Sequence, residues 1–166
     1  MSDKRAVKNA KPSHFRNHIF EKTFKSQYNE AQVWDWLNDP KTFTKSQIFP
    51  YRVEFLLKPE ESSAFSKGVL NIHHGPLLSL AGEIGEVNAH YRDLQYFYGS
   101  YAISFRLIRP YRLEFSSAPT EKGTHFTVKL SSFVQPSIYG MWSWSQGLFW
   151  SRFGNWMDRS IKKRIK

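Results

Sequence analysis

The chain has 166 residues, with 24 Lys and Arg against 14 Asp and Glu, a formal net charge of +10 and no cysteine. The lack of cysteine excludes disulfides and cysteine-based zinc sites, and no apolar run approaches the roughly 18 residues of a membrane-spanning helix. Because the basic N-terminus also lacks the apolar segment of a secretory signal, we expect one soluble, cytoplasmic domain with a single sizeable core.

The first residues, 1–13, are polar, basic and without periodicity, which predicts a disordered tail. A loose alternation of apolar side chains over residues 14–25 then predicts the first strand. We expect residues 14–166 to form a single domain, because this length fits one unit with one core.

A helix follows, and both of its ends have sequence signals. Asn29 can cap the first turn, and Gln32 three residues later completes a capping-box pattern. Four apolar residues then share one helical face: Ala31, Val33, Trp34 and Leu37. Asp39 and Pro40 stop this helix, and a second short helix is expected over residues 40–45.

The apolar pattern then changes to a period of two, which is typical of half-buried strands. Six further strands are expected, over residues 49–57, 65–74, 84–91, 94–108, 111–116 and 126–134. The intervening segments are expected to be turns or loops, over residues 58–63, 77–82, 109–110 and 121–123. Gly99 and Ser100 predict a bulge or bend within the longest of these strands.

The last element is predicted to be one long helix from Ile138 to Ile165. Five large apolar residues form a stripe along it: Trp142, Phe149, Phe153, Trp156 and Met157. Only this helix is long enough to cover the apolar face of the sheet. The expected fold class is therefore α+β, with a seven-stranded curved antiparallel sheet around a long C-terminal helix and two short helices after the first strand.

Three features of this arrangement carry a resemblance to a known family. They are the stretch Ala31-x-Val33-Trp34-x-x-Leu37-x-Asp39-Pro40, the Gly123-Thr124 turn into a long last strand, and the final amphipathic helix. In these features residues 15–164 resemble the START/Bet v 1-like (SRPBCC) superfamily, which includes polyketide cyclases and lipid-transfer proteins. The resemblance implies a helix-grip fold with a hydrophobic cavity between sheet and helix. The family has no universal catalytic motif, so no catalytic residue is assigned and no cofactor is expected.

A ligand in such a cavity would contact inward-facing aromatic residues of the strands and the apolar stripe of the helix. The candidate ligand-binding residues are Tyr96, Tyr98, Tyr101, Phe105, Trp142, Phe149, Phe153 and Trp156. The first hypothesis is thus a binder or carrier of a small hydrophobic ligand, such as a lipid or a polyketide-like molecule. The second is a cyclase/aromatase-type enzyme that uses the same cavity, although the sequence contains no recognisable catalytic motif.

Two groups of polar residues give further candidates. His73 and His74 are adjacent on a predicted strand and point to opposite faces, so no metal site is expected there. Arg106, Arg109 and Arg112 are expected on solvated strand faces. The alternative is that one of these arginines binds the carboxylate or phosphate of a ligand in the cavity.

The distribution of charge bears on the partners of the protein. Residues 1–18 carry +4 and residues 159–166 carry +5, which leaves +1 for residues 19–158. A nucleic-acid-binding domain usually spreads its basic residues over a structured face, so nucleic acid is not expected as a partner. The tryptophan-rich final helix and its basic end give a third hypothesis, peripheral contact with an anionic membrane or a protein partner. Burial of Trp144 and Trp150 is the favoured expectation, and the sequence sets no oligomeric state.

Overall fold

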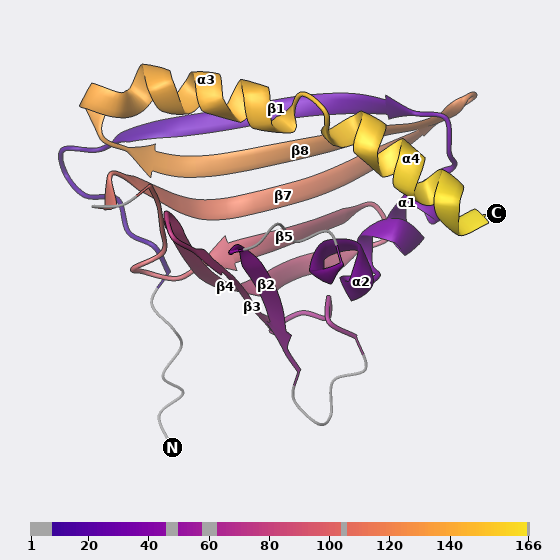
Figure 1. Ribbon diagram of the computed structural model, residues 1–166, viewed down its shortest axis with the longest axis horizontal. Helices are drawn as coiled ribbons and strands as arrows, with labels where there is room; N and C mark the ends of the chain where they lie inside the picture. The colour runs from indigo at the N-terminus through magenta and orange to yellow at the C-terminus, as the bar shows by residue number, and fades with distance from the viewer. Residues whose placement is uncertain (1–7, 46–49, 58–62, 104–105, 166) are drawn as a thin grey trace.

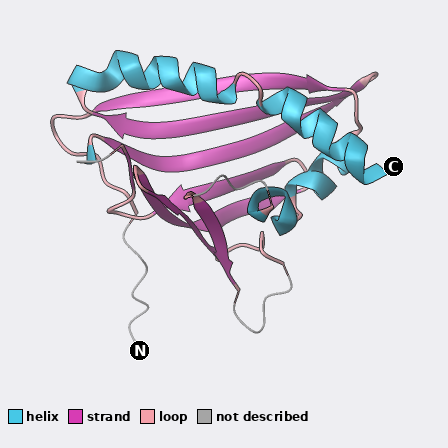
Figure 2. Ribbon diagram, in the orientation of Figure 1, coloured by secondary structure: helices cyan, strands magenta, loops and turns pink. Residues whose placement is uncertain are grey.

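The computed structural model describes residues 8–45, 50–57, 63–103 and 106–165. These residues form an antiparallel sheet with helices on one of its faces (Figures 1 and 2). None of the described helices combines the length and the apolar character that crossing a membrane requires.

The strands follow one another along the sheet in the order β1-β8-β7-β5-β4-β3-β2, and a short β6 pairs with β4 and β7. Their bounds are β1 Arg16–Ser26, β2 Arg52–Leu56, β3 Leu70–Gly75, β4 Leu78–Asn88, β5 Tyr91–Tyr96, β6 Tyr101–Ala102, β7 Ile108–Thr120 and β8 Gly123–Val134. The described residues thus hold eight strands rather than the seven expected, and the additional strand is the two-residue β6. The expected curved antiparallel sheet is confirmed (Figure 1).

The β7–β8 hairpin is the turn that the sequence predicts most directly. Thr120 pairs with Gly123, and β8 pairs along its whole length with β1 on its other side. Gly123 has a φ of +137°, and a Cβ atom there would lie 2.0 Å from the carbonyl oxygen of Ser26. Only glycine can therefore occupy this turn without displacing the end of β1.

The strand boundaries differ most from the expected ones at three places. Residues 77–82, expected to be a loop, lie almost entirely in β4. The expected connection at Arg109 and Pro110 lies inside β7, where the register with β8 shifts between Pro110 and Arg112. A proline is tolerated at such an irregularity because no regular ladder bond is needed from its nitrogen. The expected strand over 94–108 is divided into the end of β5 and β6.

The first two helices are confirmed. In α1 (Glu30–Leu37), Asn29 and Gln32 form the reciprocal hydrogen bonds of a capping box. Asp39 then caps α2 (Pro40–Thr44) by accepting a hydrogen bond from the backbone N–H of Lys41. Both helices lie near one end of the sheet, close to the C-terminal helix (Figure 1).

The C-terminal helix is divided into α3 (Tyr139–Trp150) and α4 (Phe153–Ile165), after a short 3-10 helix over Pro136–Ile138. The expected long C-terminal helix is confirmed, with an interruption at Ser151 and Arg152 that the sequence did not indicate. In Figure 1, α3 runs along β1, and α4 crosses towards α1. Arg164 anchors the end of α4 through an ion pair of 2.9 Å with Asp39.

An aromatic cluster fills the space between α4, α1 and the sheet. The ring of Phe153 lies 5.6 Å from Phe24, 6.0 Å from Trp36 and 6.2 Å from Phe126, measured between ring centroids. The ring of Trp156 lies 4.9 Å from Trp36. The volume beneath α4 is thus occupied by the protein's own side chains.

The N-terminal segment contacts the sheet earlier than expected. Asn9 is buried, and its Nδ2 donates to the carbonyl oxygen of Pro110 at 2.8 Å. Lys8 forms an isolated bridge with Phe97. Asn9 thus packs against the sheet, although it belongs to the segment 1–13 that was expected to be a disordered tail. Residues 1–7 lie outside the described part of the chain.

Candidate functional site

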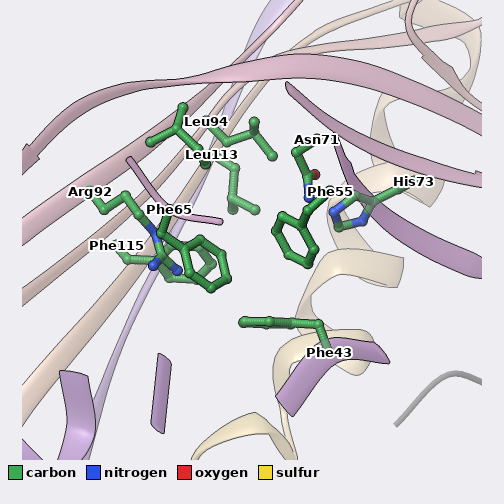
Figure 3. Close-up of a pocket in the computed structure, with 10 residues that line it drawn as sticks. Phe43, Phe55, Phe65, Asn71, His73, Arg92, Leu94, Leu113 and Phe115 are labelled. Atoms are coloured by element: carbon green, nitrogen blue, oxygen red, sulfur yellow. The ribbon is translucent and has the colours of Figure 1, made fainter. Parts of the chain in front are cut away.

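A small cavity of about 50 Å³ lies between α2 and the apolar face of the sheet. Seven of its ten lining residues are apolar, and the other three are polar. The lining residues are Phe43, Phe55, Phe65, Asn71, His73, Ile84, Arg92, Leu94, Leu113 and Phe115. Figure 3 shows Arg92, Phe65 and Phe115 on one side of this space, and Asn71 and His73 on the other. The cavity holds only a few non-hydrogen atoms in this conformation.

Two paired strands supply one wall of the cavity. Alternation along β5 points Arg92 and Leu94 to the helix-covered face of the sheet. Antiparallel pairing with β7 sets Arg92 opposite Phe115 and Leu94 opposite Leu113. These four neighbouring side chains form a continuous surface that is apolar except for the guanidinium group.

Three phenylalanines from separate parts of the chain complete the lining of the cavity. Phe43 comes from α2, Phe55 from β2, and Phe65 from the segment before β3. The ring of Phe65 lies 5.9 Å from Phe43 and 4.9 Å from Phe55, both with edge-to-face geometry. Phe43 and Phe55 are only partly buried, so the outer side of the ring cluster reaches the surface.

Arg92 is the only cation among the cavity-lining residues that the structure describes, and its side chain is 2% exposed. Its Nη1 donates to Oδ1 of Asn38 at 2.6 Å, and its Nη2 donates to the carbonyl oxygen of Leu37 at 3.3 Å. Its guanidinium carbon lies 3.9 Å from the centroid of Phe65. Burial lowers the pKa of Arg92 to about 9, so the side chain stays protonated at neutral pH.

The other two polar residues of the cavity come from β3. Burial, together with the charge of the adjacent His74, lowers the pKa of His73 to about 4, so its imidazole is neutral at neutral pH. Asn71 is buried, and its Oδ1 has no hydrogen-bond partner among the described residues. His74 lies outside the cavity lining, within 3.4 Å of Glu54. The described residues contain no group of three or more metal-binding side chains.

The residues that sequence analysis nominated for ligand binding are distributed over several surfaces, and those that the structure describes do not line this cavity. Tyr96 is buried on β5, Tyr101 is half-buried, and Tyr98 is exposed. Phe105 lies outside the described residues.

The nominated residues of the C-terminal helix are similarly divided. Trp142 is buried against His18 of β1, with 6.5 Å between ring centroids. Phe153 and Trp156 belong to the aromatic cluster beneath α4, whereas Phe149 is 71% exposed. Roles for these residues in ligand binding stay predictions.

An arginine, Arg92, lines the cavity, but it is not one of the three that the sequence analysis named. Arg112 forms an ion pair of 2.6 Å with the buried Asp93, and Arg109 lies over the rings of Phe15 and Tyr98. Arg106 is exposed, and none of the three lines the cavity. The signal for Arg92 was its position two residues before Leu94, on the same face of a strand.

The fold is the helix-grip α+β fold that the sequence resemblance implied. The structure is similar to that of protein SA2116 from Staphylococcus aureus, with a TM-score of 0.68 and 10% identity over 93% of this chain and 99% of that one. It is also similar to norcoclaurine synthase from Thalictrum flavum in complex with dopamine and hydroxybenzaldehyde, with a TM-score of 0.65 and 10% identity over 97% of this chain and 98% of that one. A third similar structure is that of protein MLL2253 from Mesorhizobium loti, with a TM-score of 0.60 and 16% identity over 91% of this chain and 99% of that one. At these identities the similarity establishes the fold alone. No family model and no curated protein matches the sequence.

Proposed function

We propose that the protein binds a small, largely apolar molecule in the cavity between α2 and the sheet. The observation that carries this proposal is the lining itself, in which seven apolar residues surround three polar ones. Ligand sites commonly combine apolar walls with a few polar groups that fix orientation. The fold supports the same function, because one structural neighbour, norcoclaurine synthase, is in complex with the small molecules dopamine and hydroxybenzaldehyde.

The size of the cavity sets a condition on this binding. Ligand sites typically have volumes of roughly 300–1,000 Å³, whereas this cavity measures about 50 Å³. A ligand larger than a few atoms must therefore displace part of the phenylalanine cluster. Phe43 and Phe55 are the groups to move, since both are partly buried and Phe43 lies on a helix of five residues.

Binding of the neutral fluorescent probe N-phenyl-1-naphthylamine tests the site. Phe43→Ala enlarges the cavity and should tighten binding by about tenfold, whereas Leu113→Phe fills it and should weaken binding. Phe149→Ala removes a ring from the exposed surface of α3 and serves as the control. Binding that responds to Phe149→Ala but not to the two cavity variants would contradict the proposal and favour a site on the C-terminal helix. Native mass spectrometry of freshly purified protein would identify a retained ligand.

The cyclase/aromatase alternative requires convergent polar side chains that act on a substrate. Asn71, His73 and Arg92 all line the cavity, so polar groups for such chemistry are present. This alternative is tested by incubating the protein with the molecule found by mass spectrometry and measuring turnover in the wild type and in His73→Gln.

We retain a cytoplasmic location as part of the main proposal.

As a second function, we propose that α3 contacts an anionic membrane surface. Trp150 is buried, as expected, but Trp144 is 69% exposed and Leu148 is 61% exposed. With Met141, these two residues follow one another at spacings of three and four, which places them on one face of α3. Contiguous exposed apolar surface of this kind marks interaction sites.

Charge argues for an anionic bilayer as the partner of this face. Exposed Arg152 follows α3 directly, and three exposed basic residues of α4 come after it in the chain: Arg159, Lys162 and Lys163. Apolar and aromatic side chains next to basic residues suit the boundary between lipid headgroups and acyl chains.

Sedimentation with vesicles tests this contact. Vesicles of phosphatidylcholine with phosphatidylserine should bind the protein, and high salt should weaken the binding. Trp144→Ser combined with Leu148→Ser should reduce it by about tenfold or more. Tyr98→Ser, which removes an exposed aromatic residue elsewhere, should leave it unchanged. The proposal would be contradicted if both variants lost vesicle binding equally, or if the protein bound vesicles of pure phosphatidylcholine but not those that contain phosphatidylserine.

A further inference from the structure

Arg92 is a buried cation whose charge is not balanced by any acidic residue in the described chain. Arg112, Arg164 and Lys129 all pair with carboxylates, whereas Arg92 forms no ion pair with any residue that the structure describes. Buried arginines are rare unless they are paired, because removing a charge from water is costly. The position therefore requires an explanation beyond packing.

The contacts of Arg92 hold it in place without neutralising it. Asn38 and Leu37 accept hydrogen bonds at the C-terminal end of α1, where the helix dipole favours a cation. The rings of Phe65 and Phe115 lie 3.9 Å and 5.7 Å from the guanidinium carbon. A guanidinium has five N–H donors, and these hydrogen bonds use one each from Nη1 and Nη2. The group is thus fixed in the wall of the cavity with donors to spare.

Asn71 gives an independent indication that the cavity accommodates a polar ligand group. The residue is 2% exposed and lines the cavity, and its Oδ1 has no hydrogen-bond partner in the described part of the chain. Leaving a buried acceptor unpaired costs free energy, because the group loses its hydrogen bonds to water. A hydroxyl or N–H group of a ligand would satisfy it.

We propose that the ligand of this cavity is an organic carboxylate, with its anionic group on Arg92 and its apolar body against the phenylalanine cluster. This inference rests on the proposed function of the cavity. It adds the chemical class of the ligand, which the apolar lining alone does not define.

The charge of the site favours a carboxylate over a phosphate. A carboxylate carries a single negative charge and is planar, so it matches one guanidinium in charge and geometry. A phosphate monoester carries roughly −1.5 to −2 at neutral pH, which would leave uncompensated negative charge beside Phe65 and Phe115. His73 cannot supply the missing positive charge, because burial lowers its pKa to about 4.

Three probes that share a benzyl group test the proposal by isothermal titration calorimetry: phenylacetate, phenylacetamide and benzylphosphonate. They are compared in the wild type and in Phe43→Ala, where the deleted ring leaves room for the phenyl group. Phenylacetate should bind at least about tenfold more tightly than phenylacetamide, as expected for a charge-assisted hydrogen bond. Arg92→Met should bring this ratio close to one, and Arg92→Lys should retain a preference for the anion.

Arg109→Met is the matched control, because Arg109 also lies over aromatic rings but outside the cavity lining. It should leave the ratio unchanged. If phenylacetate and phenylacetamide bound equally tightly, in the wild type and in Phe43→Ala alike, the assignment of an anionic ligand would be overturned. If benzylphosphonate bound more tightly than phenylacetate, the choice of a carboxylate would be overturned. These comparisons and Arg92→Lys remain decisive if Arg92→Met does not fold. Failure of both the charged probes and the neutral naphthylamine to bind would instead refute the proposed function.

Discussion

His73 should make the stability of the protein depend on pH in the mildly acidic range. Burial and the adjacent His74 lower the pKa of His73 from 6.5 to about 4. Between these values the unfolded chain binds a proton at this position and the folded protein does not, so acid favours unfolding. The stability that depends on neutral His73 is therefore present above pH 6.5 and is lost progressively as the pH falls to about 4.

The magnitude follows from the size of this change. A difference of one pKa unit corresponds to about 1.4 kcal/mol, so lowering the pKa from 6.5 to about 4 corresponds to a loss of about 3 kcal/mol over the whole range. The residue as a whole is half-buried rather than fully enclosed, and partial contact with water reduces the expected loss to about 2 kcal/mol.

Urea unfolding of the wild type, His73→Gln and His125→Gln at pH values of about 7 and about 4.5 measures this loss. The decrease in the free energy of unfolding should be smaller in His73→Gln than in the wild type by about 2 kcal/mol. His125 is exposed, so its substitution should leave the decrease unchanged. Burial also lowers the pKa of His18, but this contribution is common to all three proteins. An equal decrease in the wild type and His73→Gln would refute the reasoning.

Four further substitutions test the fold by urea or thermal unfolding. Phe153→Ala should lower the free energy of unfolding by about 3–4 kcal/mol, because it removes the central ring of the aromatic cluster beneath α4. Phe149→Ala, on the exposed face, should change it by less than about 0.5 kcal/mol. Similar losses in the two variants would contradict the placement of these rings. Gly123→Ala should cost about 2 kcal/mol or more, because φ is +137° and the new Cβ would meet the backbone of β1, and a neutral effect would show that the turn is not constrained. Arg164→Met should cost about 1 kcal/mol at low salt and less at high salt, since its ion pair with Asp39 is partly exposed; a cost that is independent of salt would exclude this explanation.

The elements that the sequence predicts well are those with local signals. The capping box at Asn29 and Gln32 defines the start of α1, and the turn at Gly123 defines the β7–β8 hairpin. The boundaries of β4 and β7 were missed because glycine and proline next to a strand resemble loop residues. In the structure, Pro110 lies at a register irregularity that only the pairing of β7 with β8 creates.

The cavity was not predictable in the same way, because non-local contacts assemble it. Phe43, Phe55 and Phe65 come from a helix, an edge strand and a turn, and no spacing in the sequence links them. Aromatic residues surround the C-terminal helix on several sides, so their pattern could not show which of them, Trp144 or Trp150, would be buried. The sequence thus predicted a helix-grip fold, but neither the side chains that line the cavity nor its small volume of about 50 Å³.

The position of β1 at one end of the strand order also has a consequence for self-association. An edge strand presents unpaired backbone groups to which another chain could add a strand, and β1 is 11 residues long. Charged residues occur along it, among them Glu21, Lys22 and Lys25, and α3 runs beside it (Figure 1). Charge and the neighbouring helix both oppose intermolecular β-pairing at this edge, so the chain can keep a long open strand without forming fibrils through it.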